Sequence, residues 1–285
     1  MTPSFFSRRA LVTPVLLAPL AGCSASDAAN ALTPRAGIMR ESGLAYGPLP
    51  RQRMDLYRPA DLAEAAPLLV FIHGGGWRDG AREQYAFLAQ PMARLGLMVA
   101  IPDYRLWPGA RFPAFVEDAA LAVRMLAARE RRRRLVLMGH SAGAFNAACL
   151  ALDPSWGVQE AVGGFIGLAG PYDFRADEVN PPDIFPQPRI QAAPAPLRAV
   201  TTPPLLLLHG EADTTVGPYH SRILAERATT AGVRVRHVAY PGMSHLGIIA
   251  AMASPALWLG LADARVRDEV SAFLLSSADG GVAPR

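Results

Sequence analysis

The sequence predicts an α/β fold in which a mostly parallel, twisted sheet carries helices on both faces. Short apolar runs alternate along the chain with longer segments that are compatible with helices. Buried parallel strands have this apolar character, and each parallel connection needs a crossover, which is usually a helix. The chain has 285 residues, of which 51% are hydrophobic and 18% charged, and this composition suits one globular domain with a sizeable core.

The elements are expected in a regular order. Two short edge strands, at 44–47 and 52–57, precede the alternation. The main strands are then expected at 68–73, 97–103, 135–139, 164–169, 205–209 and 233–240, and the helices at 82–95, 114–128, 142–152, 221–230 and 261–275. Right-handed crossovers between parallel strands place such helices on both faces of the sheet.

The N-terminus is predicted to be a targeting segment. Arg8 and Arg9 precede the apolar stretch 10–22, which is shorter than the ~20 residues that span a bilayer and is typical of a secretory signal peptide at 1–22. Leu20-Ala21-Gly22-Cys23 resembles the bacterial lipobox, so we expect Cys23 to be lipidated and 23–42 to form a tether before a domain at 43–285. The protein would then be exported and membrane-anchored, in the periplasm or on the cell surface. The alternative is an ordinary signal peptide with an incidental cysteine.

A candidate nucleophile lies at a strand-to-helix turn. Gly139-His140-Ser141-Ala142-Gly143 follows the apolar run 135–138 and precedes the expected helix at 142–152. In this context a G-x-S-x-G motif holds its serine on a sharp turn, with the hydroxyl exposed at the ends of the strands. Ser141 is therefore the candidate nucleophile. The alternative is a serine that merely caps the helix.

A glycine-rich loop follows the strand at 68–73. Three glycines in His73-Gly74-Gly75-Gly76-Trp77 leave backbone amides accessible to a ligand. We expect the amides of Gly75 and Gly76, together with that of Ala142, to form an oxyanion hole, which stabilises the negative charge that develops during acyl transfer. The alternative is a flexible turn.

An acid and a base are expected downstream in loops that follow two strands. Glu211 and Asp213 both follow the run 205–208, and Asp213 is favoured because Glu211 lies closer to the strand end. His245 is the only one of the six histidines expected on a loop beyond that acid, so it is the candidate general base. Asp173 is a reserve acid, and Asp118 is expected to hold nearby backbone or Arg111.

Several functions are excluded or disfavoured by composition. The chain contains no lysine, which excludes a P-loop lysine and a Schiff base on lysine. Its net charge is +4, and the basic run at 131–134 lies at the end of an expected helix, so no nucleic-acid partner is expected. Cys149 is expected to be a buried, inert thiol. No cysteine or histidine spacing indicates a metal site, and no cofactor is expected.

One segment interrupts the alternation. The stretch 171–200, here called the lid, carries seven prolines between the sixth and seventh main strands. An insertion there lies over the carboxyl ends of the strands, where open α/β sheets bind ligands. We expect a small lid that shapes the substrate pocket, with Trp77, Tyr104 and Phe174 as candidate lining residues. A structureless surface loop is the alternative.

Taken together, these motifs resemble α/β-hydrolase carboxylesterases, in particular the bacterial group with feruloyl-esterase-like and kynurenine-formamidase-like enzymes. The matching segments are 71–78, 103–106, 111–119, 139–143, 170–174, 209–216 and 242–245. The resemblance implies the α/β-hydrolase fold, a catalytic triad of Ser141, Asp213 and His245, and hydrolysis of small short-acyl or aryl esters through an acyl-enzyme. Two alternatives stay open: a formamidase or amidase with the same triad, and a non-catalytic surface lipoprotein that binds a ligand.

Overall fold

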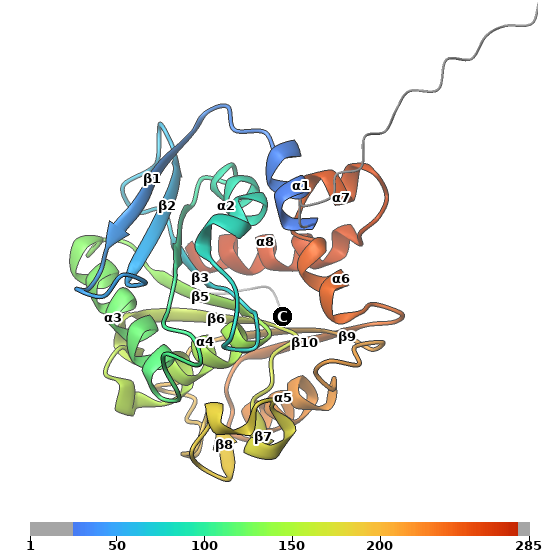
Figure 1. The fold of residues 1–285 in the computed structure, drawn as a ribbon. Helices are drawn as coiled ribbons and strands as arrows, with labels where there is room; N and C mark the ends of the chain where they lie inside the picture. The colour runs from blue at the N-terminus through green and yellow to red at the C-terminus, as the bar shows by residue number, and fades with distance from the viewer. Residues whose placement is uncertain (1–24, 279–285) are drawn as a thin grey trace, which may run out of the picture.

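An eight-stranded sheet runs through the centre of the molecule (Figure 1). The computed structural model describes residues 25–278. The strands of the sheet are β1 (Ile38–Ala45), β2 (Arg53–Pro59), β3 (Leu68–Ile72), β4 (Met98–Pro102), β5 (Leu135–His140), β6 (Val162–Leu168), β9 (Leu205–Gly210) and β10 (Val235–Tyr240). Their spatial order is β1-β2-β4-β3-β5-β6-β9-β10. The run from β4 to β10 is parallel, and only β1 and β2 are antiparallel to their neighbours. The predicted α/β fold is confirmed.

Helices cover both faces of this sheet. They are α1 (Ala25–Leu32), α2 (Ala86–Ala93), α3 (Ala114–Arg129), α4 (Ala142–Leu152), α5 (Tyr219–Thr230), α6 (His245–Ala250), α7 (Ser254–Trp258) and α8 (Ala264–Ala278). Helices α3, α4 and α5 lie on one side, and α2, α6 and α8 on the other (Figure 1). The crossovers therefore produce the layered arrangement that the alternating sequence predicts.

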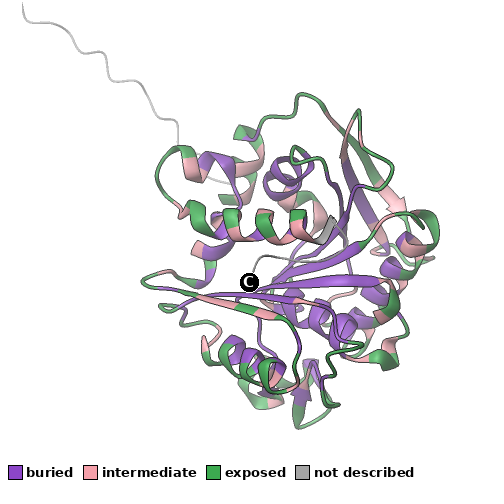
Figure 2. Cartoon of the chain, turned by 180° about the vertical axis from the view of Figure 1, so that it is seen from behind, coloured by how far each residue is buried: buried purple, intermediate pink, exposed green. Residues whose placement is uncertain are grey.

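Two apolar cores follow from the alternation of side chains along the strands. In β3, Leu68, Val70 and Ile72 join the core under α3 and α4, whereas Leu69 and Phe71 join the core under α2 and α8. Successive side chains of a strand point to opposite faces, so a continuous apolar run fills both layers. Figure 2 shows the central strands as buried, while the helices mix buried and exposed positions.

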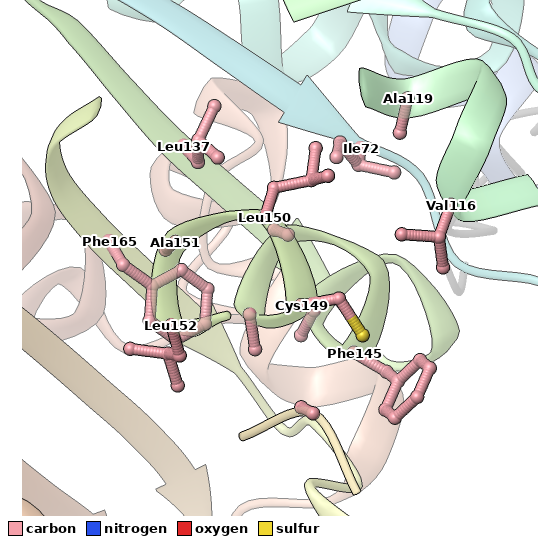
Figure 3. Packing of buried hydrophobic residues seen from close by; sticks show 14 of the residues in the cluster. Ile72, Val116, Ala119, Leu137, Phe145, Cys149, Leu150, Ala151, Leu152 and Phe165 are labelled. Atoms are coloured by element: carbon pink, nitrogen blue, oxygen red, sulfur yellow. The ribbon is translucent and has the colours of Figure 1, made fainter. Parts of the chain in front are cut away.

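Helix α4 packs closely against the sheet because most of its residues are small. All eleven of its residues are buried. Figure 3 shows Cys149 among apolar side chains of this core, with Phe145 and Val116 nearby. Cys149 is a free cysteine, and burial raises the pKa of its thiol well above the usual value. A buried thiol of this kind stays protonated and is a poor nucleophile.

The chain is ordered earlier than the sequence indicates. Residues 25–42, expected to belong to a tether, contain α1 and most of β1, and β1 pairs with β2. The side chain of Asn30 fixes α1, because its amide donates to the Glu83 carbonyl oxygen at 2.9 Å and accepts from the Phe87 amide at 2.7 Å. Helix α1 buries no residue, so its sequence lacks the apolar periodicity that reveals a packed helix.

The lid lies between β6 and β9 and has its own structure. It contains a small antiparallel hairpin of β7 (Asp173–Arg175) and β8 (Arg189–Gln191) and two short 3₁₀ turns. Its apolar side chains Phe174, Ile184, Phe185 and Ile190 are buried in the core on the α3–α4 side. The lid is therefore packed onto the domain and is not a structureless loop.

Candidate active site

Ser141 occupies a strained turn between β5 and α4. Its φ is 55° and its ψ is −126°, a conformation that costs free energy unless the surroundings enforce it. The flanking glycines allow this turn because a Cβ on Gly139 would lie 2.3 Å from the Gly143 carbonyl oxygen, and a Cβ on Gly143 would lie 2.1 Å from the Ile72 carbonyl oxygen. The Ser141 amide also donates to the Leu168 carbonyl oxygen at 2.9 Å, which fixes the turn against β6.

Asp213 and His245 are brought together from the loop after β9 and the first residue of α6. Nδ1 of His245 lies 2.7 Å from Oδ2 of Asp213, although the two residues are 32 positions apart. Oδ1 of Asp213 accepts hydrogen bonds from the amides of Thr215 at 2.8 Å and Val216 at 2.9 Å. Burial acts to raise the pKa of Asp213, but these amides and His245 outweigh it and hold the pKa below its usual value. Asp213 is thus an ionised carboxylate that orients the His245 ring.

Ser141 reaches the same end of the sheet through β5. Oγ of Ser141 makes no hydrogen bond to another of the residues 25–278, and the side chain faces a cavity. The preceding residue, His140, links the two sides of the site: its Nε2 lies 3.0 Å from the His245 carbonyl oxygen, and the two imidazole rings are 4.8 Å apart. Contacts between a nucleophile and its base are often loose without substrate and tighten on binding.

The glycine-rich loop presents backbone amides to the same cavity. Gly75 and Gly76 have φ values of 116° and 59°, a region that favours glycine. Within the described part of the chain, the amides of Gly75, Gly76 and Ala142 donate no hydrogen bond, and Gly76 and Ala142 line the cavity beside Ser141. Gly75 does not line it; its carbonyl accepts from the amides at 78 and 79 and closes the turn.

Gly74 is a residue of this loop that the sequence analysis did not single out. A Cβ on Gly74 would lie 3.3 Å from the Cβ of Ser141 and 3.1 Å from Nδ1 of His140. Gly74 therefore lets the loop pass close to the elbow. The signal was present in the sequence, because the first glycine after a strand is the one that must turn next to the neighbouring strand end.

The cavity at Ser141 has a volume of about 320 Å³. Of the three candidate lining residues, Trp77 and Phe174 line it and Tyr104 does not. Tyr104 is fully buried: its hydroxyl donates to the His73 carbonyl oxygen at 2.9 Å, and its ring stacks on His73 with the centroids 4.3 Å apart. Tyr104 supports the glycine-rich loop from behind, so its expected place in the pocket is corrected.

The other candidate acids have different partners. Glu211 is exposed, and Asp173 pairs with Arg189 within the lid hairpin. Asp118 is buried but accepts from Arg105 and Gln52, not from the expected Arg111, which pairs with Asp183 in the lid. The expectation for Arg111 was wrong because the chain turns between Arg111 and α3 and directs the arginine outward.

His209 is a further residue that the sequence analysis placed only at a strand end. Its Nε2 lies 3.0 Å from the Val216 carbonyl oxygen and 3.3 Å from Oδ2 of Asp213, and its Nδ1 lies 2.7 Å from Oγ of Ser221. Burial lowers the pKa of His209, so the ring is neutral near pH 7. A neutral imidazole that joins β9, the Asp213 loop and α5 fixes the position of the acid.

The fold and this strand-end geometry define an α/β-hydrolase. Among residues 25–278 no group of three or more histidine, cysteine or acidic side chains is placed to hold a metal ion. None of the helices in the same range is long and apolar enough to cross a membrane.

The family is shown by comparison of sequences. The profile of the prolyl oligopeptidase family matches residues 114–259, a little over half of the chain, and the chain belongs to this family. A second profile, described as BD-FAE, matches residues 54–165.

Relatives and solved structures agree with this assignment. An isoprenylcysteine alpha-carbonyl methylesterase of Arabidopsis thaliana is 27% identical over 71% of this chain and 55% of its own length. The esterase LipC of Mycobacterium tuberculosis is 28% identical, with 70% and 58% covered. The chain thus spans little more than half the length of these relatives. A hyperthermophilic esterase from the archaeon Pyrobaculum calidifontis superposes with a TM-score of 0.68 at 25% identity, and 90% of each chain is covered. The chain is an α/β-hydrolase enzyme whose relatives are esterases.

Proposed function

We propose that the protein is a serine carboxylesterase that hydrolyses small esters through an acyl-enzyme on Ser141. The observation that carries this proposal is the coupled pair of Asp213 and His245, joined at 2.7 Å at the end of the sheet where Ser141 occupies its strained turn. A carboxylate that accepts from Nδ1 of a histidine leaves Nε2 of that ring free to act as a base. The esterase relatives support the same reaction class.

The chemistry follows from the positions of these groups. Nε2 of His245 takes the proton of the Ser141 hydroxyl as Oγ attacks the ester carbonyl carbon. The negative charge that develops on the carbonyl oxygen is stabilised by the free amides of the glycine-rich loop and of Ala142. His245 then gives the proton to the departing alcohol. Water, activated by the same imidazole, attacks the acyl-enzyme, and Ser141 leaves with the proton.

Labelling by a fluorophosphonate tests the nucleophile directly. The wild-type protein should become labelled at Ser141 and should hydrolyse 4-nitrophenyl acetate, whereas Ser141→Ala should lose both properties. A Ser155→Ala variant, which changes a serine in the short turn after α4, should keep both. Absence of labelling in the folded wild-type protein would instead support a ligand-binding lipoprotein without catalysis.

An amidase activity is the second candidate, because a kynurenine formamidase of Danio rerio is 28% identical over 46% of this chain. Ester and formamide hydrolysis share the same nucleophile and oxyanion site, so the residues do not distinguish them. The ratio of kcat/KM for 4-nitrophenyl acetate to that for N-formylkynurenine distinguishes them. We expect the ester to be favoured, and a ratio below one would reassign the protein as a formamidase.

We also propose that the chain is exported and anchored by a lipid on Cys23. The signal peptide expected at 1–22 and Cys23 itself lie outside the described residues, which begin at position 25 with α1. Helix α1 packs beside α7 (Figure 1), where Trp258 and Leu259 are 66% and 67% exposed. Exposed apolar side chains of this kind often face membranes or partners, and tryptophan favours the membrane interface.

Fractionation of cells tests this anchor. Cys23→Ser should move the esterase activity from the membrane fraction to the soluble fraction, because a lipid anchor supplies the apolar burial that holds the protein there. Cys149→Ala, which changes the buried cysteine of α4, should leave the activity with the membranes. Membrane association that survives Cys23→Ser would contradict the proposal.

A further inference from the structure

A second cavity adjoins the one that contains Ser141. It has a volume of about 490 Å³ and lies between the lid hairpin β7–β8 and helix α5. Four residues line both cavities: Phe174, Glu178, Tyr219 and His220. Ligand sites of drug-sized molecules have volumes of roughly 300–1,000 Å³, so the two cavities together exceed what an acetyl or butyryl group requires.

His220 is an unusual part of this shared wall. The residue is only 6% exposed, yet neither ring nitrogen makes a hydrogen bond to another residue of the described chain. Its ring packs at 4.2 Å from that of Tyr219, and it contributes to the surface of both cavities. Buried polar groups are nearly always hydrogen-bonded, and leaving one without a partner costs roughly 1–3 kcal/mol. A nearly buried imidazole without a protein partner therefore points to a ligand.

The charge state of His220 limits what that ligand carries. Burial is the main cause that lowers the pKa of His220 to about 4, so the ring is neutral near pH 7. A neutral imidazole offers one N–H donor and one nitrogen acceptor. It therefore matches a hydroxyl or amide group, which can both donate and accept, better than it matches a charged group.

The rest of the second cavity is apolar or already paired. Arg189 binds Asp173 at 2.8 Å, Arg175 binds Asp177 at 2.7 Å, and Arg227 donates to the Ala193 carbonyl oxygen at 2.8 Å. The remaining walls are mainly apolar or aromatic: Tyr172, Phe174, Pro188, Tyr219, Ile223 and Leu224. Such a cavity favours an uncharged, largely apolar group.

We propose that this second cavity binds the distal part of an extended ester substrate, an uncharged apolar group that ends in a hydroxyl or amide, and that His220 is the specificity-determining residue that hydrogen-bonds it. The proposal rests on the proposed function in that it takes Ser141 as the residue that faces the scissile ester. It differs from the expectation of short-acyl esters, because the site then extends past Phe174 and Tyr219 into the lid.

Binding to an inactive variant tests this without requiring turnover. The Ser141→Ala protein is titrated by calorimetry with matched esters that end in a hydroxyl or in a methyl group, one series extended on the acyl side and one on the alcohol side. We expect the hydroxyl form to bind about tenfold more tightly in one of the two series, which is the usual value of a hydrogen bond to a buried neutral partner. Ser141→Ala with His220→Phe keeps the ring but removes both polar atoms, and the Kd ratio should fall to about one.

A matched histidine provides the control. His237 lies on β10, and its Nε2 is buried without a partner. Ser141→Ala with His237→Phe should therefore keep the Kd ratio of Ser141→Ala. Equal affinities of hydroxyl and methyl esters in both series, or a preference that survives His220→Phe, would overturn the proposal. Failure of the wild-type protein to hydrolyse esters would contradict the proposed function and would leave this binding ratio as a separate result.

Discussion

The strand-end site and the lid lie against each other but are held by different forces. At the strand ends, the position of Ser141 depends on backbone atoms that would overlap with any side chain at Gly139 or Gly143. In the lid, the surface is held by ion pairs such as that of Arg175 with Asp177, whose side chains are 70% and 62% exposed. Beneath that surface, the lid's aromatic side chains pack into the core. Geometry fixes the first region, whereas apolar burial fixes the second.

This difference teaches which region tolerates change. An overlap of backbone atoms cannot be relieved by a side chain that moves, so the strand-end site accepts almost no substitution. Solvent-exposed ion pairs contribute little, so the lid can change its surface while it keeps its buried aromatic residues. The reaction would then depend on the rigid region, and the choice of substrate on the lid.

The largest expected effect is on catalysis at the strand ends. Asp213→Asn should lower kcat by up to ~10⁴-fold while the fold stays intact, because an amide favours the wrong tautomer of His245. Rates with 4-nitrophenyl acetate and a circular dichroism spectrum measure both. Glu211→Gln, which changes the exposed acid of the same loop, is the matched control and should keep its activity. A severe loss in Glu211→Gln with a mild one in Asp213→Asn would transfer the role of the acid.

The second effect is on folding. Gly143→Ala should destabilise the protein by about 3 kcal/mol or more, because its Cβ would lie 2.1 Å from the Ile72 carbonyl oxygen and 2.3 Å from that of His73. Urea unfolding measures this change. Gly157→Ala is the control for backbone strain without overlap, because Gly157 has a φ of 66° and an added Cβ would meet no atom within 4 Å. It should cost about 1 kcal/mol. Similar losses in both variants would refute the backbone overlap.

The contrast also explains what the sequence predicted. Apolar runs and glycines state the constraints of the sheet and of the elbow, so the main strands, the turn at Ser141 and the segments of Asp213 and His245 were found from local patterns. The lid hairpin and α1 were not, because β7 and β8 have three residues each and α1 buries none. The partners of Asp118 and the cavity at His220 depend on contacts between distant segments, which local patterns do not contain.

The third effect concerns pH and the histidines around the strand-end site. Burial lowers the pKa of His73 to about 4 and that of His140 to about 3, below the value of about 6.5 in an unfolded chain. Above pH 6.5 both states are neutral, so these groups do not affect stability. Below it, the unfolded chain binds protons that the folded chain does not, so stability should fall by about 2 kcal/mol per histidine between pH 7 and pH 5.

Urea unfolding at both pH values measures this loss. His73→Phe should reduce the difference between pH 7 and pH 5 by about 2 kcal/mol, whatever it does to the stability at pH 7. Tyr85→Phe is the control, because it changes a ring stacked on His73, with the centroids 6.0 Å apart, without removing an imidazole. It should keep the pH dependence of the wild-type protein. A pH dependence that is unchanged in His73→Phe would show that the ring is protonated in the folded protein.

The smallest effect is expected at the surface of the lid. Arg175→Ala removes the ion pair with Asp177, in which both partners are mostly exposed, so we expect no measurable change in Tm. Phe185→Ala, in the same segment, removes a ring that is 2% exposed and packs on Trp77 with the centroids 4.8 Å apart, and it should lower Tm clearly. If Arg175→Ala lowered Tm as much as Phe185→Ala, the ion pair would hold the lid, and the two regions would differ less than their geometry indicates. A change confined to Phe185→Ala would show that the lid is kept on the domain by aromatic packing against Trp77, which lines the Ser141 cavity, so the surface charges of the lid are free to vary without moving that wall.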